Sequence, residues 1–230
     1  MIQRVYERAR RARRLDRVLV ATDDARIAEA VRGFGGDAVM TEASHASGTD
    51  RLAEAVRGVL DAEIVVNVQG DEPLLDPDDV DLTVAALLED QDLSLSTLSV
   101  PLRSAEEMLS PSVVKVVSDA RGDALYFSRS PIPFVRGEGA DLRSAAAEAV
   151  ARGLARKHVG LYVYRREALL RFASLPPAPL ELAEGLEQLR ALHHGMRLRV
   201  VPREGECGPA VDTPEDLARV RELLAGETVK

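Results

Sequence analysis

Hydrophobic positions along the first hundred residues alternate between two spacings. Residues 2–15 carry apolar side chains three or four positions apart, the spacing of one face of an α-helix. Similar helical patterns follow over 27–34, over 50–60 and from residue 77 onward. Between them lie short apolar runs of the kind found in buried strands, at 17–21, 38–40 and 64–68. Strands that alternate with helices of this length predict βαβ units and a parallel sheet.

The middle of the chain is patterned differently. Residues 94–100 and 113–117 are extended, and a turn at 119–122 leads into a further strand over 124–128. Because Gly122 can adopt a positive φ in that turn, the segment predicts a β-hairpin. Residues 136–156 are rich in Ala, Arg and Glu and fit either a helix or a mobile insertion.

The last third of the chain returns to alternating elements: a strand over 159–163, one helix over 180–193, and a strand over 198–201. The final helix opens with Thr213 as its N-cap, Pro214 at its first position and Asp216 in the reciprocal capping place. Neither an internal repeat nor a low-complexity linker divides the sequence. Residues 1–230 are therefore interpreted as one α/β domain.

Composition narrows the possible functions. The 230 residues suffice for a full hydrophobic core, and their net charge of −8 argues against broad nucleic-acid binding. Arginines crowd residues 4–14, but the apolar stripe there favours a solvated helix face over an RNA- or membrane-binding helix. Since no run of about 18 apolar residues and no signal peptide occur, we expect a cytoplasmic protein without a membrane partner. Cys207 is the only cysteine, which excludes an internal disulfide.

Two aspartates follow predicted strands. Asp71 comes just after the strand ending at Val68, within the segment NVQGDEP of residues 67–73, and Asp212 precedes the last helix. Ligands of open parallel sheets bind beyond the carboxyl ends of strands, and Mg²⁺ takes oxygen ligands from one or two acids plus substrate phosphates. The pair predicts a magnesium site. Alternatively, Asp71 only solvates a loop and Asp212 is an extra capping acid, a role that Thr213 already fills.

The segment HASGTDR at 45–51 offers small residues, hydroxyls and an arginine at the start of a predicted helix. This arrangement suits a phosphate or a sugar, because a helix N-terminus presents free N–H groups. Ser and Thr at such positions are also common as simple helix caps, so both interpretations stay open.

Eight segments follow one another along the chain: VATDD at 20–24, HASGTDRLAE at 45–54, IVVNVQGDEP at 64–73, VVKVV at 113–117, ALYFSRSPIP at 124–133, HVGLYVYR at 158–165, LEQLR at 186–190 and VDTPEDL at 211–217. In this order they resemble the CMP-Kdo synthetases, or 3-deoxy-manno-octulosonate cytidylyltransferases, where Kdo stands for 3-deoxy-D-manno-octulosonate. NVQGDEP alone is typical of the nucleotidyltransferase superfamily, whereas YFSRSPIP and LEQLR are typical of the Kdo branch.

The resemblance implies a Rossmann-like nucleotidyltransferase fold with a mostly parallel sheet and a β-hairpin lobe that forms a homodimer. It implies transfer of CMP from CTP to Kdo, giving CMP-Kdo and pyrophosphate for lipopolysaccharide biosynthesis, with Mg²⁺ as the cofactor. By the same resemblance Asp71 and Asp212 are the catalytic metal ligands. The remaining implied residues are Gln69, Arg129, His158, Tyr162, Glu187 and Gln188 around the sugar acid, and Thr22, Asp23, Ser47, Gly48 and Arg51 around the nucleotide.

Structural interpretations of the sugar residues remain. His158 could be a satisfied core histidine, Arg129 a surface residue, and Glu187 with its neighbour could face solvent on an amphipathic helix. Two functional alternatives also stay open. One is the same chemistry on a related acid, either 8-amino-Kdo or a sialic acid; the other is a non-catalytic protein that binds a sugar or a nucleotide.

The sequence departs from the family at its start. The family begins with a strand and a loop rich in Arg, Ser, Gly and Lys that binds the CTP phosphates, and this chain starts at the helix that follows the loop. No Gly-rich loop with a lysine occurs elsewhere in it. A misassigned or truncated start and a crippled paralogue would each explain this, and the intact later motifs favour the former.

Overall fold

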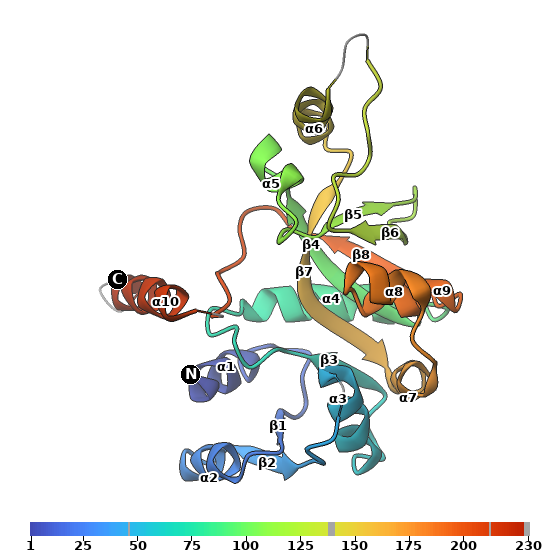
Figure 1. Cartoon of the computed structure of the whole chain (residues 1–230). Helices are drawn as coiled ribbons and strands as arrows, with labels where there is room; N and C mark the ends of the chain where they lie inside the picture. Colours follow the sequence, from blue (N-terminus) through green and yellow to red (C-terminus); the bar gives the residue numbers. More distant parts are fainter. Residues whose placement is uncertain (46, 138–140, 212, 228–230) are drawn as a thin grey trace. The chain divides into compact units, whose positions relative to one another are not determined.

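The computed structural model describes residues 1–45, 47–137, 141–211 and 213–227. It divides into two compact units (Figure 1). The first unit comprises residues 1–62, 66–82 and 207 onward, and the second comprises residues 63–65 and 83–206. Each unit is described by itself, and the interpretation of the chain as one domain stays a prediction.

The first unit contains the βαβ pattern expected from the early part of the sequence. Its strands β1 and β2 are parallel neighbours, with Leu19 opposite Asp37 and Thr22 opposite Met40. Asp24 begins the intervening helix, since its carboxylate accepts the N–H of Arg26 at 2.8 Å. The elements of this unit are α1 (Ile2–Ala9), β1 (Leu19–Thr22), α2 (Ala25–Gly33), β2 (Asp37–Met40), α3 (Gly48–Arg57), the first part of α4 (Pro77–Glu89) and α10 (Pro214–Glu227).

Helix α1 buries the first part of the apolar stripe predicted over residues 2–15. Val5, Tyr6 and Ala9 are buried on one face, and the arginines lie mostly on the exposed side. The helix ends at Ala9, and the chain then turns so that the N–H groups of Arg13 and Arg14 donate to the two carboxylate oxygens of Asp81, at 3.1 and 2.8 Å. The solvated-face interpretation of the basic start is thus confirmed.

The second unit is built on one sheet with the strand order β6-β5-β7-β4-β8. The strand β3 (Ile64–Asn67), whose first two residues belong to this unit, pairs with β7. Figure 1 shows β7 as the long curved strand beside β4. The elements are β4 (Leu95–Pro101), α5 (Ala105–Leu109), β5 (Lys115–Ser118), β6 (Ala124–Ser128), α6 (Leu142–Ala151), β7 (Arg156–Arg165), α7 (Arg166–Ser174), α8 (Pro179–Glu184), α9 (Gln188–His193) and β8 (Leu198–Pro202).

The ladders refine the prediction of a mostly parallel sheet. Parallel pairing holds for β1 with β2 and for β4 with β8. In the second unit, however, β5 pairs antiparallel with β6 and β7, and β7 pairs antiparallel with β4. For β5 and β6 the reason is local, because a hairpin forces its two strands to run in opposite directions. The α/β class is confirmed, and the sheet of this unit is mixed.

The predicted hairpin is confirmed. The strands β5 and β6 flank a turn in which Gly122 has a φ of +83° and donates its N–H to the carbonyl oxygen of Asp119 at 3.0 Å. Asp119 also accepts the N–H groups of Arg121 and Asp123 through its carboxylate. Nearby, α5 and α6 lie side by side over a small core that includes Met108 (Figure 1). Residues 142–151 are therefore helical, while 138–140 lie outside the described residues.

The predicted single helix over 180–193 is wrong. It is two helices, α8 and α9, separated at Gly185, which ends α8 in the left-handed conformation with a φ of +62° and a ψ of +40°. A left-handed glycine after the last helical residue reverses the chain and stops the helix. The break makes Glu187 the N-cap residue and Gln188 the first residue of α9.

Candidate active site

The carboxyl end of β1 carries two of the predicted nucleotide residues. Thr22 is buried, its carbonyl oxygen accepts the N–H of Thr41 at 3.0 Å, and its hydroxyl accepts the N–H of Asp24 at 3.1 Å. Asp23 forms an ion pair with Arg51, with 3.2 Å between Oδ1 and Nη1. The same Nη1 donates to the hydroxyl of Thr41 at 2.7 Å. The structure therefore brings together the β1 end and α3.

The start of α3 carries two more of the predicted nucleotide residues, Ser47 and Gly48. Ser47 is the N-cap, its hydroxyl accepting the N–H of Asp50 at 3.2 Å. A methyl group added to Gly48 would lie 3.9 Å from Oε1 of Gln69, so this turn faces the loop after β3. The free N–H groups at such a helix start suit an anion. Gln69 was predicted to contact the sugar acid, and within the first unit its side chain lies beside Gly48.

A histidine–carboxylate contact that sequence reasoning missed closes the loop before α3. His45 Nε2 contacts the carboxylate of Glu54, which also accepts the N–H of Glu42 at 3.0 Å. The hydrogen bond from His45, followed by that from Glu42, lowers the pKa of Glu54. The spacing of nine residues between the partners gives no helical or strand period, which is why the pattern did not reveal it.

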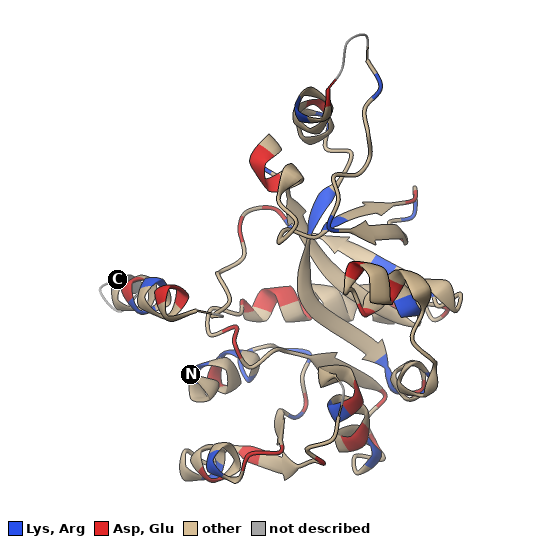
Figure 2. Cartoon of the chain, in the orientation of Figure 1, with Lys and Arg blue, Asp and Glu red and all other residues tan. Residues whose placement is uncertain are grey.

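The loop after β3 concentrates negative charge. The N–H of Val211 donates to the carbonyl oxygen of Asp71 at 2.9 Å, which places the residue before Asp212 against the predicted metal ligand. Burial raises the pKa of Glu72 to about 7, with the charges of Asp71 and Asp79 adding to the effect. Acidic side chains also gather at the start of α4 (Figure 2).

The structure describes only one of the two predicted magnesium ligands, Asp71. Asp212 lies outside the described residues. Among the residues that the structure does describe, no group of three or more His, Cys, Asp or Glu side chains is arranged to hold a metal ion. The assignment of Asp71 and Asp212 as magnesium ligands therefore stays a prediction.

The second unit brings together His158 and Tyr162 of β7. Their rings lie 5.4 Å apart between centroids, and Phe127 meets the His158 ring edge-on at 5.1 Å. The hydroxyl of Thr97 lies 3.0 Å from Nε2 of His158. Burial lowers the pKa of His158 to about 3. For Tyr162, burial raises the pKa well above its usual range, and the charges of Tyr164 and Glu187 raise it further. His158 is therefore neutral at physiological pH.

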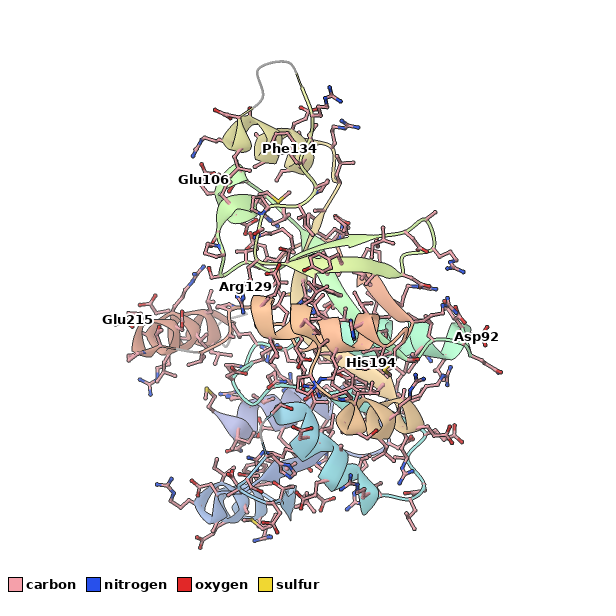
Figure 3. All side chains as sticks on the ribbon, turned by 45° about the vertical axis from the view of Figure 1, so that its right-hand side comes forward. Asp92, Glu106, Arg129, Phe134, His194 and Glu215 are labelled. Atoms are coloured by element: carbon pink, nitrogen blue, oxygen red, sulfur yellow. The ribbon has the colours of Figure 1, made fainter. Side chains whose placement is uncertain are left out.

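Arg129 is fixed by backbone oxygens rather than lying free on the surface. Its Nε donates to the carbonyl oxygen of Glu184 at 2.7 Å, its Nη1 to that of Pro111 at 3.0 Å, and its Nη2 to that of Gly185 at 3.5 Å. The carboxylate of Glu184 accepts the main-chain N–H of Arg129 at 2.9 Å and the hydroxyl of Ser128 at 2.7 Å. Figure 3 shows Arg129 beside α8.

The start of α9 carries the remaining two residues predicted to contact the sugar acid, Glu187 and Gln188. Gln188 is buried, and Glu187 lies 3.8 Å from Arg190 of the same helix. Glu187 also lies near enough to Tyr162 for its charge to raise the pKa of that phenol. The interpretation of Gln188 as a solvent-facing residue is wrong, because the break at Gly185 turns this helix start inward.

Comparison with known proteins defines the class. The cytidylyltransferase family profile matches residues 1–198, most of the chain. A solved structure of CMP:2-keto-3-deoxy-manno-octonic acid synthetase complexed with CTP superposes with a TM-score of 0.89 at 44% identity, covering 98% of this chain and 88% of that one. A 4-diphosphocytidyl-2C-methyl-D-erythritol synthase from Anaerococcus prevotii has a TM-score of 0.61 at 12% identity, with coverage of 97% and 88%, and shows the fold alone.

The curated relatives narrow this class. The 3-deoxy-manno-octulosonate cytidylyltransferase of Geobacter sulfurreducens is 55% identical over 97% of this chain and 88% of its own. That of Solibacter usitatus is 50% identical over 97% of this chain and 84% of its own. The chain belongs to the family of 3-deoxy-manno-octulosonate cytidylyltransferases, as the eight segments predicted.

Proposed function

We propose that this protein transfers CMP from CTP to Kdo, giving CMP-Kdo and pyrophosphate as a step of lipopolysaccharide biosynthesis. The observation that carries the proposal is the 55% identity to a 3-deoxy-manno-octulosonate cytidylyltransferase over 97% of the chain. The 0.89 TM-score against a CMP-Kdo synthetase complexed with CTP supports CTP as the nucleotide.

The chemistry is a nucleotidyl transfer. The anomeric hydroxyl oxygen of the sugar acid forms a bond to the α-phosphorus of CTP, its proton is lost to solvent, and the bond to the bridging oxygen of the β-phosphate breaks to release pyrophosphate. Such a step gains most from positioning and from neutralising charge. In our proposal the first turn of α3 and the Asp23–Arg51 pair hold the nucleotide, because they offer N–H groups and a fixed cation.

The residues of the second unit suit the sugar acid. Arg129 has five N–H donors, of which three are used by carbonyl oxygens, so two remain for the sugar carboxylate among the described contacts. His158 and Tyr162 offer neutral polar atoms for hydroxyl groups. Glu187 and Gln188 at the start of α9 would bind further hydroxyls.

We further propose that Asp71 and Asp212 hold Mg²⁺. The raised pKa of Glu72 supports this: burial is its main cause, and the charges of Asp71 and Asp79 add a repulsion that a divalent cation would relieve. The hydrogen bond from Val211 to Asp71 supports the pairing of the two aspartates. When bound, the ion would neutralise the phosphate charge that develops in the reaction.

We propose that the protein is a cytoplasmic homodimer whose two subunits contact each other through the hairpin lobe. Leu125 on β6, Phe134 and Leu142 expose large apolar side chains in this part of the second unit, with Phe134 visible in Figure 3. None of the described helices is long and apolar enough to cross a membrane. Analytical ultracentrifugation tests the dimer; a wild-type protein that sediments as a monomer at assay concentrations contradicts it.

The test of the function is a pyrophosphate-release assay with CTP and Mg²⁺ on purified protein. Kdo, 8-amino-Kdo and a sialic acid are offered in parallel at equal concentration. We expect the highest kcat/KM with Kdo and no release without a sugar acid. Faster turnover of either other acid would reassign the substrate, and retained binding of CTP or Kdo without any release would favour a non-catalytic protein.

A further inference from the structure

The His158–Tyr162 pair depends on an irregularity in β7. Residues four positions apart on an extended strand are separated by about 13 Å, yet these two rings lie 5.4 Å apart. The cause is a register shift against β4: Thr97 lies opposite Tyr162, whereas the next residue, Leu98, lies opposite Val159. Residues 160 and 161 have no partner on β4, and such a bulge re-aims the side chains beside it.

Thr97 sits at this bulge with its hydroxyl directed at three groups. The Oγ1 atom is 2.8 Å from the carbonyl oxygen of Leu161, 3.2 Å from that of Val159 and 3.0 Å from Nε2 of His158. The residue is fully buried, so water does not share these contacts. These contacts join Thr97 of β4 to the residues of β7 at the bulge.

The Thr97 hydroxyl has one proton, and the distances from Oγ1 to its neighbours indicate which of them receives the hydrogen bond. A carbonyl oxygen can only accept a hydrogen bond, so an oxygen–oxygen distance of 2.8 Å between Thr97 and Leu161 requires the hydroxyl proton between them. Oγ1 then presents only lone pairs to His158. The remaining contact is favourable only if Nε2 of His158 carries a proton and donates it.

We propose that Thr97 is a positioning residue that holds neutral His158 in the tautomer protonated on Nε2, so that Nδ1 accepts a hydrogen bond from a hydroxyl group of the sugar acid. This inference rests on the proposed function for the identity of the ligand. Among the described residues no hydrogen-bond partner of Nδ1 occurs. A neutral acceptor cannot neutralise the sugar carboxylate, so recognition of that charge falls to Arg129.

The first test reads the tautomer directly and needs no substrate. Protein labelled with ¹⁵N in its histidines is examined by two-bond ¹H–¹⁵N correlation at pH 7, and the His158 signal is assigned by its loss in His158→Gln. We expect wild-type His158 to be protonated on Nε2, and Thr97→Val to lose that single-tautomer pattern. A wild-type His158 protonated on Nδ1 overturns the inference.

The second test asks whether the tautomer matters for the sugar. Thr97→Val keeps the shape but removes the hydroxyl, and Thr97→Ser keeps the hydroxyl. We expect Thr97→Val to raise the KM for Kdo about tenfold, the loss of one oriented hydrogen bond, with the KM for CTP little changed and Thr97→Ser close to wild type. Equal rises for Kdo and CTP, or no rescue by serine, would show a merely structural role. A wild-type protein inactive on Kdo would contradict the proposed function, whereas the tautomer measurement stands apart from it.

Discussion

The ammonium group of Lys115 donates a hydrogen bond to the main-chain carbonyl oxygen of Arg129. The carbonyl oxygens of Ser110 and Val113 accept from the same Nζ at 2.9 and 2.7 Å. Lys115 is fully buried, and this burial lowers the pKa of its ammonium group. The lysine therefore ties the end of β6, which carries the proposed carboxylate-binding arginine, to the turn before β5.

Replacing Lys115 by methionine tests this tie. The substitution keeps most of the side-chain volume but leaves three carbonyl oxygens without the Lys115 donor, so we expect the free energy of unfolding to fall by about 3 kcal/mol. Urea denaturation measures it. The matched control is Lys157→Met, because Lys157 lies opposite Lys115 in the ladder and its side chain is 41% exposed. Equal effects of the two substitutions would show that the carbonyl contacts contribute nothing.

The desolvation of His158, which lowers its pKa, predicts a pH dependence of stability. Its pKa is about 3 in the folded protein, against the ordinary histidine pKa of 6.5. Between these values the unfolded chain binds a proton that the folded chain does not, so stability rises with pH across the window from about 3 to 6.5 and is fully present above it. The expected slope from this residue is at most about 1.4 kcal/mol per pH unit.

The measurement is the urea midpoint of wild type and His158→Gln at several pH values between 4 and 7. We expect the substitution to flatten the profile by close to one proton, whereas His193→Gln, at an exposed position, should leave it parallel to wild type. Parallel profiles for His158→Gln and wild type would mean that His158 is not desolvated in the fold.

Gly185 separates α8 from α9 and so sets the start of the helix that carries Glu187. A methyl group there would meet nothing within 4 Å, so Gly185→Ala isolates the cost of its left-handed φ of +62°. We expect a loss of about 1 kcal/mol, seen as a lower thermal midpoint. Gly33→Ala is the control, because Gly33 also has open space but lies at the end of α2 without a positive φ. A loss at Gly33 equal to that at Gly185 would contradict the backbone argument.

Most of the helices and strands could be predicted from local patterns in the sequence. The apolar run before Asn67, the capping pair of Thr213 and Asp216 and the turn at Gly122 are signals contained in a few neighbouring residues, and each element formed where it was predicted. The break at Gly185 was missed because the helical spacing of apolar residues continues across it. A glycine inside such a pattern can be either tolerated or a helix end, and only the left-handed φ distinguishes the two.

The candidate site was predictable only as far as its motifs reached. Arg129 and His158 were predicted through the resemblance, but the residues that contact and orient them were not. Thr97 looks like an ordinary strand former, because its contacts join strands far apart in the sequence. Lys115 looks like a surface lysine, because nothing in the local pattern indicates that its side chain turns inward to carbonyl oxygens. A pattern along the chain contains no record of such pairings, so the supporting side chains became visible only in the folded structure.

The most direct test of the account is the rate of CMP-Kdo formation by Asp71→Asn in saturating CTP, Kdo and Mg²⁺. Asparagine keeps the size and removes the charge, so we predict a fall in kcat of at least about a hundredfold, with an unchanged thermal midpoint. The control is Asp61→Asn, the same substitution at an exposed turn before β3, which should keep wild-type activity. Full activity of Asp71→Asn would contradict the assignment of Asp71 to the metal and with it the proposed mechanism.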